Sequence, residues 1–269
     1  MTKPVIVLTN DDGIHSPGLH AAVEAMLPFG RLIVVAPTRQ QTAMGRSFWG
    51  DQKEFFHPID FQAGDTQIEA YHCDCSPALI VEHAMNTLFL NAPPDLLLSG
   101  INYGENLGTD TTLSGTVGAA LQAADMKIPA LAVSLQTDFS YHFSYGEVDW
   151  SAAKHFLAHF ASYMLEQPLP GEVDVLKVDV PQDASPETAW RITRLARHMH
   201  FSTYVKNPSQ SSPISDTELC ADLNESELST DSDIYALMVD KVVSVTPLTL
   251  DMTSRIDLKD LEQSIRHTQ

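Results

Sequence analysis

The chain has 269 residues, of which 16 are basic and 35 acidic, and its formal net charge of -19 argues against a long nucleic acid or an anionic membrane surface as partner. Apolar residues make up 43% of the chain, as expected for a globular protein that buries a sizeable core. Because no apolar run approaches the roughly 20 residues of a membrane span and the start lacks a signal-peptide pattern, we expect a cytoplasmic protein that does not bind membranes.

Apolar runs alternate with helical patterns along most of the chain, which predicts an α/β fold. Several runs are apolar throughout, without the alternation of a half-exposed strand, and this is typical of parallel strands buried on both faces. We expect strands at 5–8, 31–37, 96–98, 128–135 and 173–180, and helices at 18–29, 77–88, 114–124 and 148–166.

Two adjacent acids, Asp11 and Asp12, directly follow the first predicted strand. Ligands of open α/β sheets bind beyond the carboxyl ends of the strands, and carboxylates on a turn can converge on a hard cation. Such a pair could also belong to a plain turn, since Asp bonds readily to nearby backbone N–H groups. We favour a metal or phosphate site, because neighbouring acids repel each other unless a cation or strong donors lie between them.

A polar loop at 38–47 follows the second predicted strand, and parallel strands would bring it to the same edge of the sheet. The hydroxyl of Thr42 could then reach the two acids. A loop threonine is more often an ordinary turn residue, so this signal is weak when taken alone.

The strand predicted at 96–98 runs into a loop rich in Gly and Asn. Asn102 offers a neutral oxygen suited to a hard metal, and Asn106 offers an amide donor suited to phosphate. Further along, Ser114, Gly115 and Thr116 open a helix of small residues, whose free N–H groups and dipole favour an oxyanion. An N-capped helix packed closely against the sheet explains this last pattern equally well.

The character of the chain changes near residue 188, so we divide it into a catalytic core at 1–187 and a C-terminal part at 188–269. The basic run at 190–200 could bind a nucleotide or an acidic neighbouring subunit, but we favour an exposed hairpin strand. A Pro/Ser-rich segment and an acidic stretch at 216–233 follow it. A returning strand is predicted at 242–248 and a terminal helix at 258–265.

Taken together, these motifs resemble the SurE (survival protein E) family of metal-dependent nucleotide phosphatases. The resemblance rests on Thr9-Asn10-Asp11-Asp12-Gly13-Ile14 with Pro17-Gly18, Ala36-Pro37, Ser99-Gly100-Ile101-Asn102 with Gly104-Glu105-Asn106-Leu107-Gly108, Ser114-Gly115-Thr116, Pro129-Ala130-Leu131-Ala132-Val133-Ser134 and Val243-Ser244-Val245-Thr246-Pro247-Leu248.

The resemblance implies a Rossmann-like three-layer sandwich with a central, mostly parallel sheet. It also implies a C-terminal hairpin or arm that exchanges between subunits to build a homodimer or homotetramer. The activity implied is that of a 5'-nucleotidase, an acid-phosphatase-like phosphoric monoester hydrolase acting on nucleoside 5'- and 3'-monophosphates. Other phosphomonoesters and short polyphosphates are further possible substrates.

The site residues are carried over by position from the same resemblance. One divalent ion per subunit, Mn2+ or Mg2+, would be held by Asp11, Asp12, Thr42 and Asn102. Phosphate would be bound by Asn106, Ser114, Gly115 and Thr116, and the catalytic set would be Asp11, Asp12 and Asn106. The chain departs from the family pattern where Thr42-Ala43 replaces Ser-Gly and where Cys75-Ser76-Pro77 replaces Gly-Thr-Pro.

We expect an in-line attack on phosphorus by a water molecule that the cation activates, with Asn106 and the amides of Gly115 and Thr116 stabilising the phosphoryl oxygens. A phosphatase that forms an aspartyl phosphate usually has two acids spaced D-x-D. Here Gly13 occupies the position where the second acid would follow Asp11. A phosphoacceptor module would be about half as long and would need a lysine after a late strand. A non-catalytic metal- or nucleotide-binding protein of SurE-like fold stays open because of Thr42-Ala43.

Overall fold

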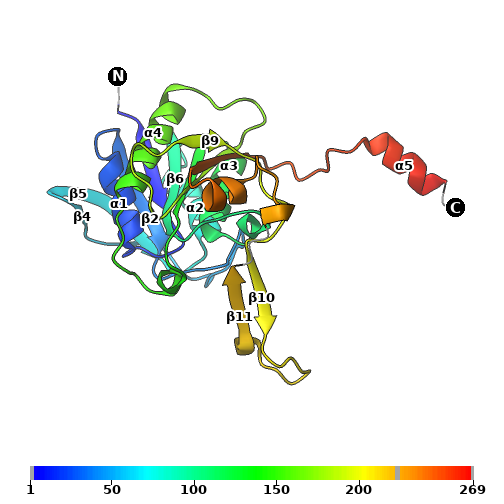
Figure 1. The fold of residues 1–269 in the computed structure, drawn as a ribbon. Helices are drawn as coiled ribbons and strands as arrows, with labels where there is room; N and C mark the ends of the chain where they lie inside the picture. Colours follow the sequence, from blue (N-terminus) through cyan, green and yellow to red (C-terminus); the bar gives the residue numbers. More distant parts are fainter. Residues whose placement is uncertain (1–2, 222–224, 268–269) are drawn as a thin grey trace.

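A computed structural model describes residues 3–221 and 225–267 of the chain. A large, mostly parallel sheet forms the centre of the molecule (Figure 1). The strand order is β3-β5-β2-β1-β6-β7-β8-β12-β9, and the six strands from β5 to β8 are parallel. Those six are β5 (Thr66–Cys73), β2 (Arg31–Pro37), β1 (Val5–Thr9), β6 (Leu96–Tyr103), β7 (Ala130–Leu135) and β8 (Val175–Val180).

Antiparallel and short strands complete the two edges of the sheet. β3 (His57–Pro58) and β4 (Phe61–Ala63) pair with β5, and β12 (Val243–Leu248) pairs antiparallel with β8. β9 (Trp190–Ile192) then pairs parallel with β12. Part of the basic run therefore forms an edge strand of the main sheet, and not the hairpin strand that we favoured from the sequence.

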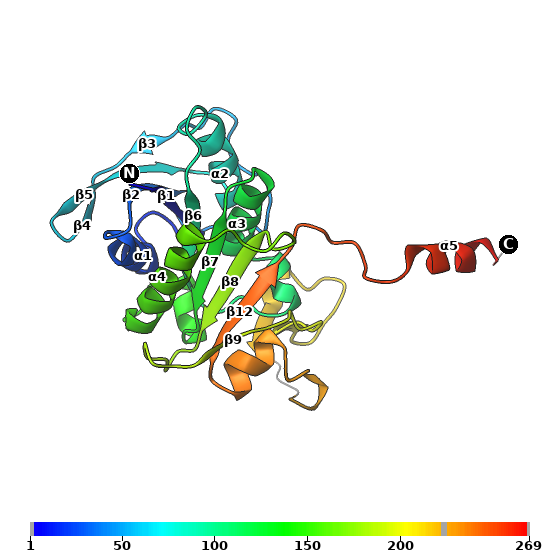
Figure 2. The same ribbon diagram turned by 90° about the horizontal axis from the view of Figure 1, so that it is seen from above.

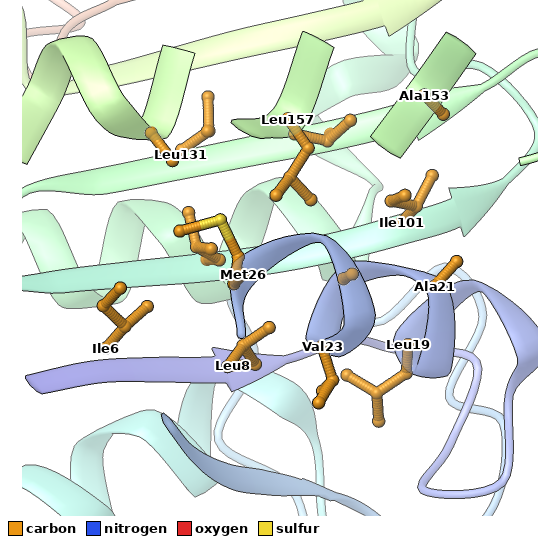
Figure 3. Packing of buried hydrophobic residues seen from close by; sticks show 14 of the residues in the cluster. Ile6, Leu8, Leu19, Ala21, Val23, Met26, Ile101, Leu131, Ala153 and Leu157 are labelled. Carbon is orange, nitrogen blue, oxygen red and sulfur yellow. The ribbon is translucent and has the colours of Figure 1, made fainter. Parts of the chain in front are cut away.

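Helices cover both faces of the sheet (Figure 2), which confirms the predicted α/β sandwich. α1 (Pro17–Met26) and α4 (Ser151–Glu166) lie on one face, and α2 (Pro77–Asn86) and α3 (Gly115–Asp125) on the other. Each face has its own apolar core, because side chains along β1 alternate: Ile6 and Leu8 join one cluster and Val7 the other. Figure 3 shows the α1 face, where Leu19, Val23 and Met26 pack with these strand residues.

The order of the strands places a crevice next to β1. From β1 the chain moves outward to β2 and β5, then crosses back to β6 on the other side of β1. The connections after β1 and β6 therefore diverge, and ligands of open α/β sheets bind at such a switch point. The predicted site residues on both connections meet here.

The C-terminal part departs from the body in two places, at a hairpin seen in Figure 1 and at a helix seen in Figures 1 and 2. β10 (Phe201–Val205) and β11 (Thr217–Ala221) form a projecting antiparallel hairpin, and α5 (Leu258–Arg266) lies at the end of an extended segment. The predicted acidic stretch supplies β11, and its residues 222–224 lie outside the described residues. Its last residue, Asp233, is fully buried.

Short helical turns connect the larger elements, and none of the helices among the described residues is long and apolar enough to cross a membrane. The turns are η1 (Thr109–Thr112), η2 (Phe139–Phe143), η3 (Ile214–Asp216), η4 (Glu225–Glu227) and the π-helix η5 (Tyr235–Val239).

Candidate active site

The turn after β1 holds Asp11 and Asp12 in fixed positions beneath the surface. Only 6% of Asp11 and 2% of Asp12 is exposed to solvent. The side chain of Asn10 closes the turn, since its amide donates to the carbonyl of Gly13 (3.0 Å) and its Oδ1 accepts from the Gly13 N–H (3.2 Å). Gly13 has a φ of +107°, a conformation that residues with a Cβ rarely adopt. The sequence signal of an apolar strand stopping at two acids thus marks a real, preformed turn.

The first turn of α3 lies directly against Asp11. The Thr116 hydroxyl donates to Oδ1 of Asp11 at 2.5 Å, and the nearby backbone N–H groups of Gly115 and Thr116 act to lower the pKa of this carboxyl. A Cβ added to Gly115 would stand 2.7 Å from Oδ2 of Asp11, so the approach requires glycine. The positive end of the helix dipole therefore faces a buried carboxylate.

Asn102, at the end of β6, joins this group through Thr116. Its Oδ1 lies 3.1 Å from the Thr116 hydroxyl oxygen. Its amide nitrogen donates to the carbonyl oxygens of Gly104 (2.7 Å) and Tyr103 (3.2 Å), which fixes the amide so that its oxygen faces the Thr116 hydroxyl. The amide oxygen predicted to bind a metal thus faces the same Thr116 hydroxyl that donates to Asp11.

Asp12 is held by neutral donors. The backbone N–H of Tyr103 donates to its Oδ2 (3.2 Å), and the side-chain amide of Gln40 donates to its Oδ1 (3.4 Å). Burial raises the pKa of Asp11, and burial together with the charge of Asp11 raises the pKa of Asp12 well above its ordinary value. Among the described residues, no lysine or arginine forms an ion pair with either acid.

Thr42 lies in the loop beside these acids, with an exposed side chain. The loop is attached on both sides of it: the Gln41 N–H donates to the carbonyl of Asp11 (2.7 Å), and the Gly45 N–H donates to the carbonyl of Leu113 (2.8 Å). Ala43, which follows Thr42, has a φ of +59°. The structure therefore places Thr42 next to the turn of Asp11, on a strained segment of backbone.

The remaining predicted phosphate residues lie on the adjoining segments. The Asn106 amide donates to the Ser134 hydroxyl (2.8 Å), and the Ser114 hydroxyl caps α3 by accepting from the Val117 N–H (3.1 Å). The capped-helix interpretation of Ser114 is thus correct, although it does not prevent the helix start from binding an anion as well.

The donor set fits a divalent cation such as Mg2+ or Mn2+. Carboxylate and amide oxygens are hard ligands, and a cation would compensate the charge of two buried acids that form no ion pair with a lysine or arginine among the described residues. Among the described residues, no group of three or more His, Cys, Asp and Glu side chains could hold a metal. The arrangement here is different, because it combines two acids with neutral oxygens.

Sequence reasoning missed Lys177 and Asp179 of β8, which contact the backbone of Asn106. Both side chains are fully buried. A signal for them existed, because charged residues rarely alternate with valine in a strand that is otherwise apolar unless they are paired.

Comparisons with known proteins find relatives over nearly the whole chain. The family model described as survival protein SurE matches residues 6–202. Two curated relatives named 5'-nucleotidase SurE align over 260 residues: that of Thermococcus kodakarensis is 37% identical, covering 96% of this chain and 97% of the relative, and that of Thermococcus gammatolerans is 40% identical, covering 96% and 94%. The crystal structure of the SurE protein from Aquifex aeolicus superposes with a TM-score of 0.77 at 28% identity, over 98% of this chain and 99% of that one.

Proposed function

Because the chain belongs to the SurE family, we propose that it is a phosphoric monoester hydrolase that releases phosphate from nucleoside 5'-monophosphates. The observation that carries this proposal is the convergence of Asp11, Asn102 and Thr116 at the switch point of the sheet. Nucleoside 3'-monophosphates, other phosphomonoesters and short polyphosphates are further candidate substrates.

One divalent ion per subunit, Mn2+ or Mg2+, completes the proposed site. Asp11, Asp12 and Asn102 would hold it, with Thr42 supplying a hydroxyl from the neighbouring loop. When bound, such a cation would supply Lewis acidity, which polarises a phosphoryl oxygen and lowers the pKa of a water molecule. The raised pKa of Asp12 supports this assignment, because a positive charge would relieve the repulsion between the two acids.

The chain's own residues would orient the phosphate and stabilise the charge that develops on it. Asn106 and the turn formed by Ser114, Gly115 and Thr116 would donate to the phosphoryl oxygens, at the positive end of an 11-residue helix. Thr116 would keep Asp11 in place through the hydrogen bond at 2.5 Å. A protein nucleophile is not needed for this chemistry.

The C-terminal part suits an exchange between subunits, and we extend the proposal to a homodimer or homotetramer. α5 lies away from the body in both views (Figures 1 and 2), and its Leu258, Leu261 and Ile265 are exposed. An apolar stripe on an amphipathic helix normally packs against another surface. The division at residue 188 and the cytoplasmic location stay predictions.

The direct test measures phosphate release from 5'-AMP and 3'-AMP with Mn2+, with Mg2+ and with a chelator. Asp11→Asn should remove most of the metal-dependent turnover, whereas Asp65→Asn, in the exposed turn between β4 and β5, should behave as wild type. Failure of the wild-type protein to release phosphate would favour a non-catalytic nucleotide-binding role. Full turnover in chelator would contradict the metal assignment.

A further inference from the structure

A fully buried lysine lies behind the candidate active site. Lys177 of β8 is 0% exposed, as are its two carboxylate partners Asp179 and Asp233. Its Nζ lies 2.5 Å from Oδ2 of Asp179 and 3.3 Å from Oδ2 of Asp233. Charged side chains are costly to bury, so a native protein keeps such a group only where its partners are well placed. The three side chains are called the Lys177 cluster below.

The Lys177 cluster holds the backbone of Asn106 on both sides. The Lys177 Nζ donates to the carbonyl oxygen of Asn106 (2.7 Å), and the Asn106 N–H donates to Oδ1 of Asp179 (2.8 Å). The peptide groups flanking this residue are thus bonded to two charged side chains. Hydrogen bonds to charged groups are stronger and more directional than neutral ones.

The same cluster and a neighbouring hydrogen bond between two side chains hold the rest of the Asn106 loop, residues 104–108. The Gly108 N–H donates to Oδ2 of Asp233 (2.9 Å), and the ring of His200 bonds Oε1 of Glu105 through its Nε2 (2.9 Å). Four buried hydrogen bonds from three distant parts of the chain, at 177–179, 200 and 233, therefore fix this loop, which carries a predicted phosphate ligand.

Backbone donors balance the second carboxylate of the cluster. Besides Gly108, the N–H groups of Ala196 and Ile234 donate to Oδ1 of Asp233, each at 2.9 Å. Burial by itself would lower the pKa of Lys177, but the charges of Asp179 and Asp233 outweigh it and raise that pKa. The lysine is thus a cation at neutral pH, although it reaches neither solvent nor substrate.

We propose that Lys177 is a positioning residue for the hydrolytic reaction, which holds the Asn106 backbone so that the Asn106 side chain is aimed at the substrate phosphate. This inference rests on the proposed function of Asn106 as a phosphate ligand. The Asn106 amide uses one hydrogen on Ser134 at 2.8 Å, which leaves its second hydrogen for a phosphoryl oxygen. Lys177 acts through the peptide groups, and Asp179 and Asp233 keep its charge stable in the core.

The test uses the full-length chain and inorganic phosphate as the probe. Lys177→Met removes the donor to Asn106, and Lys177→Met/Asp179→Asn also removes the carboxylate that the first change leaves unpaired, which protects folding. Thr193→Val is the matched control, because the buried Thr193 hydroxyl bonds Ser244 and Thr246 of β12 at 2.8 Å each. The readouts are kcat and KM for AMP, inhibition and calorimetric binding by phosphate, and the Mn2+ concentration for half-maximal activity.

Both Lys177 variants should weaken phosphate binding and raise KM by about tenfold to a hundredfold, with an unchanged Mn2+ requirement. Thr193→Val should lower the melting temperature without changing phosphate affinity. The inference is overturned if either Lys177 variant folds and binds phosphate as tightly as wild type, or if Thr193→Val weakens binding equally. Calorimetric phosphate binding tests the role of Lys177 without turnover. A wild-type protein that binds phosphate but does not hydrolyse AMP would therefore refute the proposed function and leave the inference on Lys177 to be judged by binding.

Discussion

The hydroxyl oxygen of Thr116 lies 2.5 Å from Oδ1 of Asp11, although 105 positions separate the two residues in the chain. This hydrogen bond joins the turn after β1 to the start of α3 across the switch point. The hydroxyl also lies 3.1 Å from Oδ1 of Asn102, so one side chain bridges two predicted metal ligands. The geometry of the site therefore depends on where α3 begins.

Thr116→Val should lower kcat/KM for AMP by about tenfold to a hundredfold, because valine keeps the shape of threonine and removes the donor to Asp11. Thr116→Ser keeps the hydroxyl and should retain most of the activity. Steady-state hydrolysis and thermal denaturation of both variants check this. Equal activity in the two would show that the hydroxyl is dispensable.

Gly115→Ala should reduce turnover by at least about tenfold. The new methyl group would stand 2.7 Å from both Cβ and Oδ2 of Asp11, and either Asp11 or the first turn of α3 must move. Gly171→Ala is the matched control, since nothing lies within 4 Å of a Cβ there. Turnover and KM are measured for both, and an active Gly115→Ala enzyme would mean that the carboxylate position is not critical.

The sequence predicted the parts of this site that depend on local patterns. Asp11 and Asp12 follow an apolar strand, and the helix start at Ser114 has the residues of an N-cap, so neighbours in the chain identify them. Lys177 could not be placed in this way, because its partners Asn106 and Asp233 lie 71 and 56 positions away. The basic run at 190–200 suggested a hairpin strand, but the hairpin strand β10 begins only at Phe201. Trp190–Ile192 instead pairs with β12, and a strand that comes so much later in the chain cannot be identified from the local pattern.

Ala43→Gly should stabilise the protein by about 0.5–1 kcal/mol, because the φ of +59° is strained for alanine and open to glycine. The greater freedom of glycine in the unfolded chain offsets part of the gain. Ala158→Gly, within α4, should have the opposite sign and cost about 1 kcal/mol. Urea denaturation of both variants measures the free energies, and destabilisation by Ala43→Gly would contradict the strain.

Removing residues 253–269 should reduce the assembly of subunits while the remaining body stays folded. The described part of this segment contains α5, and none of that helix is buried in the monomer, so its loss should not affect the core. Light scattering coupled to gel filtration gives the mass, and thermal denaturation gives the stability. An unchanged mass would exclude α5 from the subunit contacts.

The free energy of unfolding of the metal-free protein should fall as the pH rises above the ordinary pKa of an aspartate carboxyl group. Asp12 has a raised pKa because it is buried and because it lies beside the charge of Asp11. Between its ordinary and its raised pKa the folded chain holds more protons than the unfolded chain, so the free energy of unfolding decreases with increasing pH. Thermal denaturation in chelator from about pH 5 to about pH 8 measures this slope.

Asp12→Asn should flatten that slope and raise the melting temperature of the metal-free protein at the upper end of the range, because the amide carries no charge to bury. The exposed control Asp65→Asn should keep the wild-type slope. Adding Mn2+ should stabilise the wild-type protein more at about pH 8 than at about pH 5, because the cation binds the ionised acids of the folded state. Equal stabilisation by Mn2+ at the two pH values, or an unchanged slope in Asp12→Asn, would contradict this prediction. Either result would show that the ionisation of Asp12 beside Asp11 does not set the pH dependence of stability.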